Sequence, residues 1–125
     1  MATLRSQPGV TGVYPDYQVK ADLLDSVPLV GAPTVWQMHT NGLPVTGEGI
    51  DVAIIDTGID YTHPDLGGCI GPTCRVRGGY DFWNNDADPF DDHSHGTHVA
   101  GIVAARGVIT GVAPAANLWA IKVLS

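Results

Sequence analysis

The residues best suited to chemistry lie in one polar stretch, Asp91 to Gly101, which contains three histidines. An apolar segment of small residues follows it, and Ser94 stands where a helix N-cap would be. The sequence therefore predicts a helix that begins at His95. The imidazole of His95 would lie in the first turn, where the partial positive charge of the amide groups favours the neutral ring. A neutral imidazole can accept a proton, which is what a general base requires.

A carboxylate that could orient this base follows an earlier apolar run. Residues 51–55 read Asp-Val-Ala-Ile-Ile, which is typical of a buried parallel strand, and Asp56 comes directly after them. Functional groups of open α/β sheets gather beyond the carboxyl ends of the strands. Asp56 and His95 would together provide two members of a nucleophilic triad, namely the base and the group that orients it.

Three blocks of sequence resemble the subtilisin-like serine proteases and follow the order found in that family. Residues 52–66 contain Ile-Ile-Asp-Thr-Gly-Ile-Asp and His-Pro-Asp-Leu and resemble the aspartate block. Residues 95–101, His-Gly-Thr-His-Val-Ala-Gly, resemble the histidine block. Gly-Val-Ala-Pro at 111–114 and Ile-Lys-Val-Leu at 121–124 resemble the segment that comes next. The resemblance implies that His95 is the base and that Asp56 orients it.

The same resemblance implies that the nucleophile is missing. The family's serine lies downstream in a Gly-Thr-Ser-x-Ala type of block, a context that none of the serines here has: Ser6, Ser26, Ser94 and Ser125. Residues 23–125 would form the amino-terminal half of a peptidase catalytic domain, an incomplete three-layer α/β unit with a parallel sheet. We expect this chain alone to be inactive and to need a carboxyl-terminal half before it can hydrolyse protein or peptide substrates.

Residues 1–22 resemble the end of the inhibitory propeptide of secreted members of this family. The phrase Pro-Gly-Val-x-x-Val-x-Pro-Asp at 8–16 carries this resemblance. It implies a propeptide that binds in the substrate cleft and a maturation cleavage between Gln18 and Leu24. An N-terminal edge strand of one continuous domain is the simpler alternative.

Further elements are predicted from turn and helix signals. An extended arm at 27–32 would lead into a helix that begins at Pro33 and ends at Asn41-Gly42. Apolar runs predict two more strands, at 76–82 and 117–123.

Hard oxygen ligands recur in the acidic loop after the strand at 76–82. They are Asp81, Asn84, Asp86 and Asp88. Calcium prefers many oxygen ligands from a flexible loop, and alternating acids can turn several carboxylates toward one point. Some thermostable members of the family that this chain resembles hold calcium in the corresponding loop. We predict a structural Ca²⁺ site here, with a solvated acidic turn as the alternative.

The composition is that of an ordinary globular domain, with 44% hydrophobic and 15% charged residues. A formal charge of −7, without a run of Lys or Arg, argues against nucleic acid as a partner. The sequence shows neither a signal peptide nor a membrane span, so we expect no membrane partner. We expect a secreted, extracellular protein, whose targeting segment would then lie upstream of this sequence. A disulfide between Cys69 and Cys74 fits that location, and two free thiols are the alternative.

Three other interpretations of the motifs stay open. Asp56-Thr57-Gly58 is also typical of aspartic proteases, in which two Asp56 carboxylates of a homodimer would share a proton, but that fold is all-β. The chain could also be a non-catalytic fragment or binding module. The spacing of His93, His95 and His98 resembles zinc ligands, but no glutamate follows His95 as in His-Glu-x-x-His. We therefore expect His98 to be buried beneath the site and His93 to lie in a loop.

Overall fold

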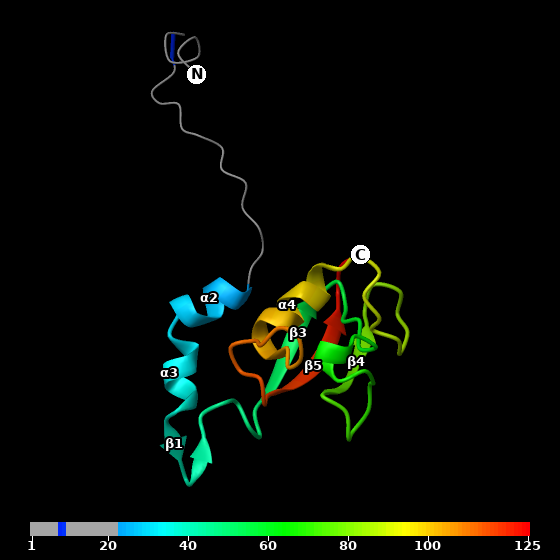
Figure 1. Ribbon diagram of the computed structural model, residues 1–125. Coiled ribbons are helices and arrows are strands. Elements are labelled where there is room, and N and C mark those ends of the chain that lie inside the picture. The colour runs from blue at the N-terminus through cyan, green and yellow to red at the C-terminus, as the bar shows by residue number, and fades with distance from the viewer. Residues whose placement is uncertain (1–7, 10–22) are drawn as a thin grey trace.

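A three-stranded parallel sheet forms the centre of the computed structural model, which describes residues 8–9 and 23–125 (Figure 1). The strands are β3 (Asp51–Asp56), β4 (Val76–Asp81) and β5 (Asn117–Lys122), in the order β3-β5-β4. The three strands predicted from the sequence are confirmed, and so is the α/β class. The prediction that β3 is a buried strand is wrong, because β3 lies at an edge of the sheet and only Ile54 of its residues is buried. Because the strands are parallel, their carboxyl ends meet at one edge of the sheet, and Asp56 lies opposite Lys122 there.

Helix α4 (His95–Ala104) covers one face of this sheet (Figure 1). Its buried residues are all small: Gly96, Ala100, Gly101 and Ala104. They pack toward a core that includes Ile54, Leu118 and Ala120. Small side chains let the helix approach the strands closely, and the first turn of α4 contacts the carboxyl end of β3 at Asp56.

The opposite face of the sheet carries exposed apolar side chains. Successive side chains of a strand alternate between its faces, and Ile55 and Trp119 point away from α4. They are 65% and 39% exposed. Within residues 23–125 the layers are therefore the sheet and the helical layer of α4.

The chain before the sheet forms two short helices and a hairpin beside this core. Helix α2 spans Leu23–Leu29, helix α3 spans Ala32–Trp36, and β1 (His39–Thr40) pairs with β2 (Leu43–Pro44). The predicted extended arm at 27–32 is wrong, because Pro28 is accommodated in the last turn of α2, where its carbonyl accepts the amide of Gly31. The ring of proline fixes φ near the helical value, but proline has no amide hydrogen to continue the helical bonding, and α2 ends one residue later.

The helix predicted from Pro33 to Asn41-Gly42 is shorter than expected. It ends at Trp36, whose indole Nε1 donates a hydrogen bond to the carbonyl of Val112 at 2.9 Å. Asn41 and Gly42 instead form the turn between β1 and β2, both with positive φ. An Asn-Gly pair is the usual two-residue connection of a hairpin, so Asn41-Gly42 indicates a hairpin turn here and not the end of a helix.

A disulfide joins Cys69 and Cys74, whose Cα atoms are 5.7 Å apart. It closes the loop between the 3-10 helix η1 (Pro64–Leu66) and β4. The helices of the described part are all too short or too polar to cross a membrane. The predictions for the propeptide or edge strand fall on residues 1–22, which lie outside the described residues except for a turn at Pro8-Gly9.

Candidate active site

The structure brings Asp56 and His95 together at the carboxyl end of β3. The Nδ1 atom of His95 lies 2.7 Å from Oδ1 of Asp56. The Asp56 side chain is 13% exposed and the His95 side chain 60% exposed, so the carboxylate lies beneath an accessible imidazole. The two residues predicted to form a base and its orienting group are therefore in direct contact.

The ionisation of Asp56 determines the direction of this hydrogen bond. Burial by itself would raise the pKa of Asp56, but hydrogen bonds from His95 and from the Thr57 amide, together with the charge of the imidazolium, hold that pKa below its usual value. An ionised carboxylate can only accept hydrogen bonds, so Nδ1 of His95 is the donor. In the neutral ring, Nε2 is then the nitrogen with a free lone pair.

Thr57 joins the strand that carries Asp56 to the helix that carries His95. Its hydroxyl accepts a hydrogen bond from the amide of Gly96 at 2.9 Å and donates one to Asp91, also at 2.9 Å. Thr57 is only 4% exposed, so water does not compete for these bonds. Thr57 follows Asp56 and Gly96 follows His95. The hydrogen bond between Thr57 and Gly96 therefore fixes the distance between the segments that carry Asp56 and His95.

Asp91 accepts the free backbone amides at the start of helix α4. The sequence analysis assigned this capping role to Ser94. Ser94 occupies the N-cap position with φ 80°, but its side chain makes no capping hydrogen bond. The carboxylate of Asp91 instead accepts the amides of His93, Ser94 and Thr97 and the hydroxyls of Thr57 and Thr97. Burial by itself would raise the pKa of Asp91, but these hydrogen bonds outweigh it and the pKa is lowered. An aspartate before a helix is a known capping signal, so Asp91 could have been identified.

Two glycines make the contact between β3 and α4 possible. A Cβ atom on Gly96 would lie 2.1 Å from the carbonyl oxygen of Gly58, and one on Gly58 would lie 2.5 Å from the carbonyl of Pro89. Gly58 also has φ 108°, which side chains rarely allow. Larger residues at these positions would separate the helix from the strand and with it His95 from Asp56.

The four predicted calcium ligands do not converge on one point. Asp81 is buried and its carboxylate accepts the amides of Trp83 and Asn84 and the side-chain NH₂ of Asn84. Asp86 accepts the amide of Asp88, and Asp88 accepts the hydroxyl of Tyr61. Residues 23–125 contain no group of three or more His, Cys, Asp or Glu side chains that could hold a metal ion. The donor set therefore does not fit calcium in this arrangement. The predicted site would require the acidic loop to rearrange around the ion, and it stays a prediction.

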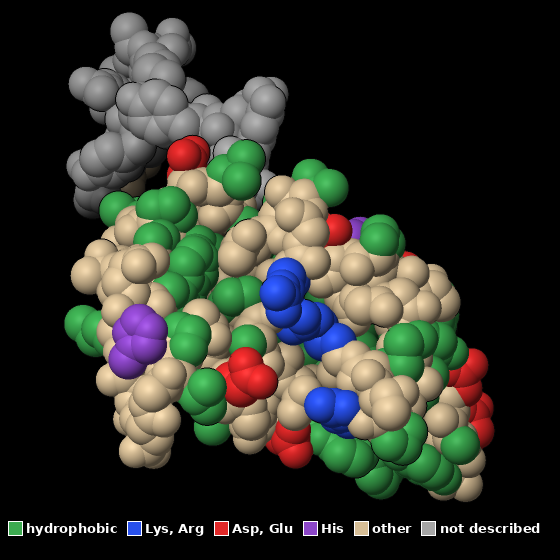
Figure 2. Space-filling view, turned by 60° about the horizontal axis from the view of Figure 1, so that its bottom comes forward, with side chains coloured by type: hydrophobic (Ala, Val, Ile, Leu, Met, Phe, Trp, Pro, Cys, Tyr) green, Lys and Arg blue, Asp and Glu red, His purple; other side chains and the backbone are tan. Residues whose placement is uncertain are grey.

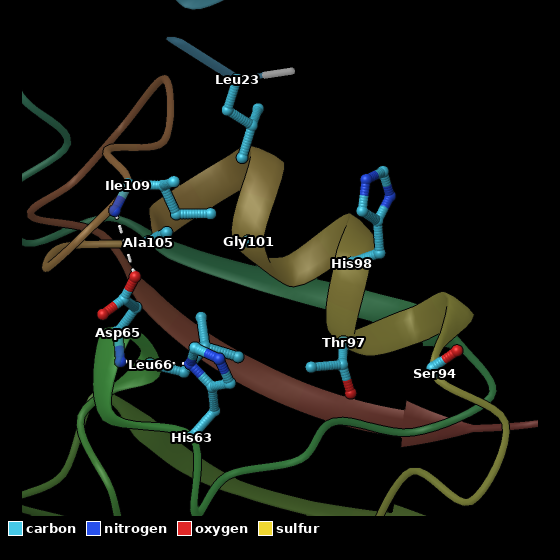
Figure 3. A pocket seen from close by; sticks show the side chains of 10 residues that line it. All are labelled: Leu23, His63, Asp65, Leu66, Ser94, Thr97, His98, Gly101, Ala105 and Ile109. Carbon is cyan, nitrogen blue, oxygen red and sulfur yellow. Dashed lines mark hydrogen bonds between the residues drawn. The ribbon is translucent and has the colours of Figure 1, made fainter. Parts of the chain in front are cut away.

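His98 is not buried beneath the site, as the sequence analysis expected. It is exposed on α4 and points away from the sheet (Figure 3). Below it lies a largely apolar cavity of about 250 Å³ between α4, η1 and Leu23, with Leu66, Ala105 and Ile109 among its lining residues. Thr97, His98 and Gly101 line this cavity from α4. Asp56 and His95 do not line this cavity.

Asp65 stabilises the loop after α4, at the edge of the same cavity. Its carboxylate accepts the amides of Val108 and Ile109, each at 3.1 Å, and Figure 3 draws the bond from Ile109. The hydrogen bonds from Ile109 and Val108 hold the pKa of Asp65 below its usual value against the opposing effect of burial. The sequence analysis could place Asp65 in the aspartate block but could not identify these partners, which lie more than forty residues away.

The structure also gathers arginines that are separated in the sequence. Arg75, Arg77 and Arg106 line one polar cavity together with Glu48, on the face where the strands begin (Figure 2). Nη1 of Arg75 donates to the carbonyls of Ala104, Pro114 and Ala116. The sequence shows no basic run, yet the fold forms a small basic cluster at the end of the sheet opposite Asp56. Three arginines in a chain of charge −7 do not change the expectation that nucleic acid is not a partner.

Comparison with known proteins places this chain in a protein family. The family model of the subtilases matches residues 47–125. The chain is 47% identical over 115 residues to the minor extracellular protease Vpr of Bacillus subtilis, an alignment that covers 85% of this chain and 13% of that protein. It is 42% identical over 130 residues to subtilisin E of Bacillus subtilis, which covers 97% of this chain and 30% of the relative.

A solved structure shows the same arrangement of elements. The MycP3 protease from the type VII (ESX-3) secretion system superimposes with a TM-score of 0.59 at 31% sequence identity, over 80% of this chain and 23% of that one. The chain therefore spans less than a third of the length of the relatives that it matches.

Proposed function

Because the chain belongs to the subtilase family, we propose that it supplies the aspartate and the histidine of a serine endopeptidase of the subtilisin type. The observation that carries this proposal is the 2.7 Å hydrogen bond between Nδ1 of His95 and Oδ1 of Asp56. It joins the two residues that the family resemblance assigns to the triad. The family match alone would not require these side chains to meet.

The geometry supports separate roles for the two residues. With Nδ1 bound to Asp56, Nε2 of His95 can take the proton of a serine hydroxyl as that oxygen attacks a peptide carbonyl. His95 then returns this proton to the amine that leaves. Asp56 stays ionised throughout, holds the imidazole in the required tautomer and stabilises its positive charge. The low pKa of Asp56 suits this role.

The proposal requires a serine that none of the matched blocks contains. A carboxyl-terminal half of the catalytic domain would supply it, and the chain alone would not hydrolyse peptides because the covalent step needs the nucleophile. Protein or peptide substrates follow from the proposed reaction. The extracellular protease among the relatives supports secretion, and the disulfide between Cys69 and Cys74 agrees with it. A propeptide within residues 1–22 remains part of the proposal.

The aspartic-protease interpretation of Asp56-Thr57-Gly58 is wrong for this chain. In that mechanism two carboxylates share a proton, and the proteases that use it have an all-β fold. Asp56 instead ends a parallel strand of an α/β unit and binds an imidazole. A non-catalytic binding module would not need the contact between Asp56 and His95, so this observation favours the enzyme over the module.

The test uses the longer protein that includes the residues downstream of Ser125. We expect an organofluorophosphate to label it at a serine, and we expect His95→Ala to abolish both labelling and peptide hydrolysis. His98→Ala is the matched control, because His98 lies on the same helix and is exposed, whereas the hydrogen-bond partners of the Asp56 carboxylate are His95 and the amide of Thr57. Hydrolysis that survives His95→Ala, or that is lost equally in both variants, would contradict the assignment of the base.

A further inference from the structure

Lys122 is a buried cation behind the proposed catalytic pair. It is the last residue of β5, it lies opposite Asp56 in the sheet, and it is 1% exposed. A buried ammonium group is costly unless all its hydrogen bonds are satisfied. The hydrogen-bond acceptors of Lys122 therefore indicate which segments its charge holds in place.

The ammonium group of Lys122 contacts both segments that carry the catalytic pair. Its Nζ donates to the carbonyl of Thr57 at 2.9 Å, directly after Asp56. It also donates to the carbonyl of Phe90 at 3.3 Å and to Oδ1 of Asp92 at 2.6 Å, both in the loop that leads into His95. An ammonium group has three donors, and each has an acceptor here.

These contacts complement the hydroxyl of Thr57. That hydroxyl joins β3 to the first turn of α4, whereas Lys122 joins β3 to the loop before the turn. Both connections pass through Thr57, which uses its amide, its hydroxyl and its carbonyl in hydrogen bonds. Without the ammonium group, the loop at 90–94 would keep the hydrogen bond between Asp91 and Thr57 and the ring contact between Phe90 and Tyr61, but it would lose both bonds to Lys122.

We propose that Lys122 is a positioning residue of the protease, and that its ammonium group fixes the separation of Asp56 and His95 from inside the fold. This inference rests on the proposed function. Lys122 has no contact with His95 and touches no reacting atom, so it acts only through Thr57, Phe90 and Asp92. Displacements of about 1 Å in a catalytic group can lower turnover by about 100-fold, which makes such a role measurable.

The test compares variants of Lys122 with a matched control at the other end of the sheet. Lys122→Met removes the charge and keeps most of the side-chain volume, and Lys122→Arg restores a cation. Arg75→Met is the control, because Arg75 is also a partly buried cation that donates to three backbone carbonyls but lies where the strands begin. Asp92→Ala is a milder variant, since the Asp92 side chain is 61% exposed and its loss should not prevent folding.

The first measurement needs only this chain. The ¹⁵N chemical shifts of the His95 ring, in histidine-labelled protein at a pH where the ring is neutral, report which nitrogen carries the proton. We expect the proton on Nδ1 in the unaltered chain, in Lys122→Arg and in Arg75→Met. In Lys122→Met we expect a mixture of tautomers, because Nδ1 no longer lies at bonding distance from Asp56. Asp92→Ala should shift the tautomers in the same direction but less.

The second measurement uses the longer protein with its nucleophile. We expect Lys122→Met to lower kcat by about 10- to 100-fold with KM within about 2-fold, and Lys122→Arg to recover most of the loss. Unchanged tautomers and unchanged kcat in Lys122→Met would overturn the proposal. If Lys122→Met does not fold, the same outcome in Asp92→Ala would overturn it. If the unaltered longer protein lacks serine-directed activity, the proposed function fails, while the tautomer measurement still decides whether Lys122 positions His95.

Discussion

We expect the hydroxyl of Thr57 to contribute more to the free energy of unfolding than its methyl group does. Thr57→Val replaces the hydroxyl by a methyl of similar size, so the packing around this buried residue is largely retained. The change removes the acceptor of the Gly96 amide and one donor to Asp91. Thr57→Ser is the matched control, because it keeps the hydroxyl and removes only the methyl group.

The magnitude follows from these two hydrogen bonds. A buried amide without a partner costs about 1–3 kcal/mol, and a hydrogen bond to a charged group contributes about 1.5–3 kcal/mol. Asp91 keeps its other four donors, so the second loss should lie at the low end. We expect Thr57→Val to lower the free energy of unfolding by about 3 kcal/mol and Thr57→Ser by about 1 kcal/mol.

Urea denaturation of the chain measures this difference. With a slope of about 2 kcal/mol per molar, the urea midpoint of Thr57→Val should lie about 1 M below that of Thr57→Ser. The slopes of the two variants should agree, since both change stability and not the surface exposed on unfolding. Equal midpoints for the two variants would refute the reasoning, because the hydroxyl would then contribute no more than the methyl group.

Three further predictions concern the parts of the chain that support this site. Hydrogen bonds lower the pKa of Asp65 in the folded state, whereas the unfolded state keeps the usual value of about 4. The ionised carboxylate therefore stabilises the fold above about pH 4, and this stabilisation is lost as the pH falls through the pKa of the folded state. The unfolding free energy of Asp65→Asn should therefore depend less on pH than that of the unaltered chain in acid titrations between about pH 5 and pH 2, and equal pH dependence would contradict the contacts seen here. A chelator should leave the thermal midpoint unchanged, because Asp81 already binds backbone amides, and a midpoint that rises with added calcium would show instead that the acidic loop rearranges around the ion. Replacing Cys69 and Cys74 by serine should cost about 2 kcal/mol in urea denaturation, the value expected for so short a loop, and no loss would mean that the disulfide does not constrain the unfolded chain.

Local patterns were sufficient to predict the strand and the helix that carry the proposed catalytic pair, Asp56 and His95. The apolar run before Asp56 predicted β3, the polar stretch before small residues predicted a helix from His95, and both predictions are confirmed. These signals succeed because a strand and a helix impose their periods on neighbouring residues. The placement of both residues at one edge also follows from the sequence, since parallel strands present their carboxyl ends together.

Local signals failed where two elements could use the same residues. Asn41-Gly42 ends helices and also connects hairpin strands, and the structure uses it for the hairpin. Ser94 and Asp91 both suit the start of a helix, and Asp91 provides the hydrogen bonds. Such choices depend on the distance to a partner such as Thr57, which is distant in the sequence.

The amino-acid sequence by itself determined the fold class, the three strands of the parallel sheet and the two residues that we propose as base and orienting group. Only the tertiary structure decided that Lys122 is buried behind them, that Asp65 binds the amides of Val108 and Ile109, and that the arginines form a cluster. The physical reason is that burial and hydrogen-bond partners arise when distant segments pack together. A periodic pattern specifies which face of an element is apolar, but not which polar atoms it will meet.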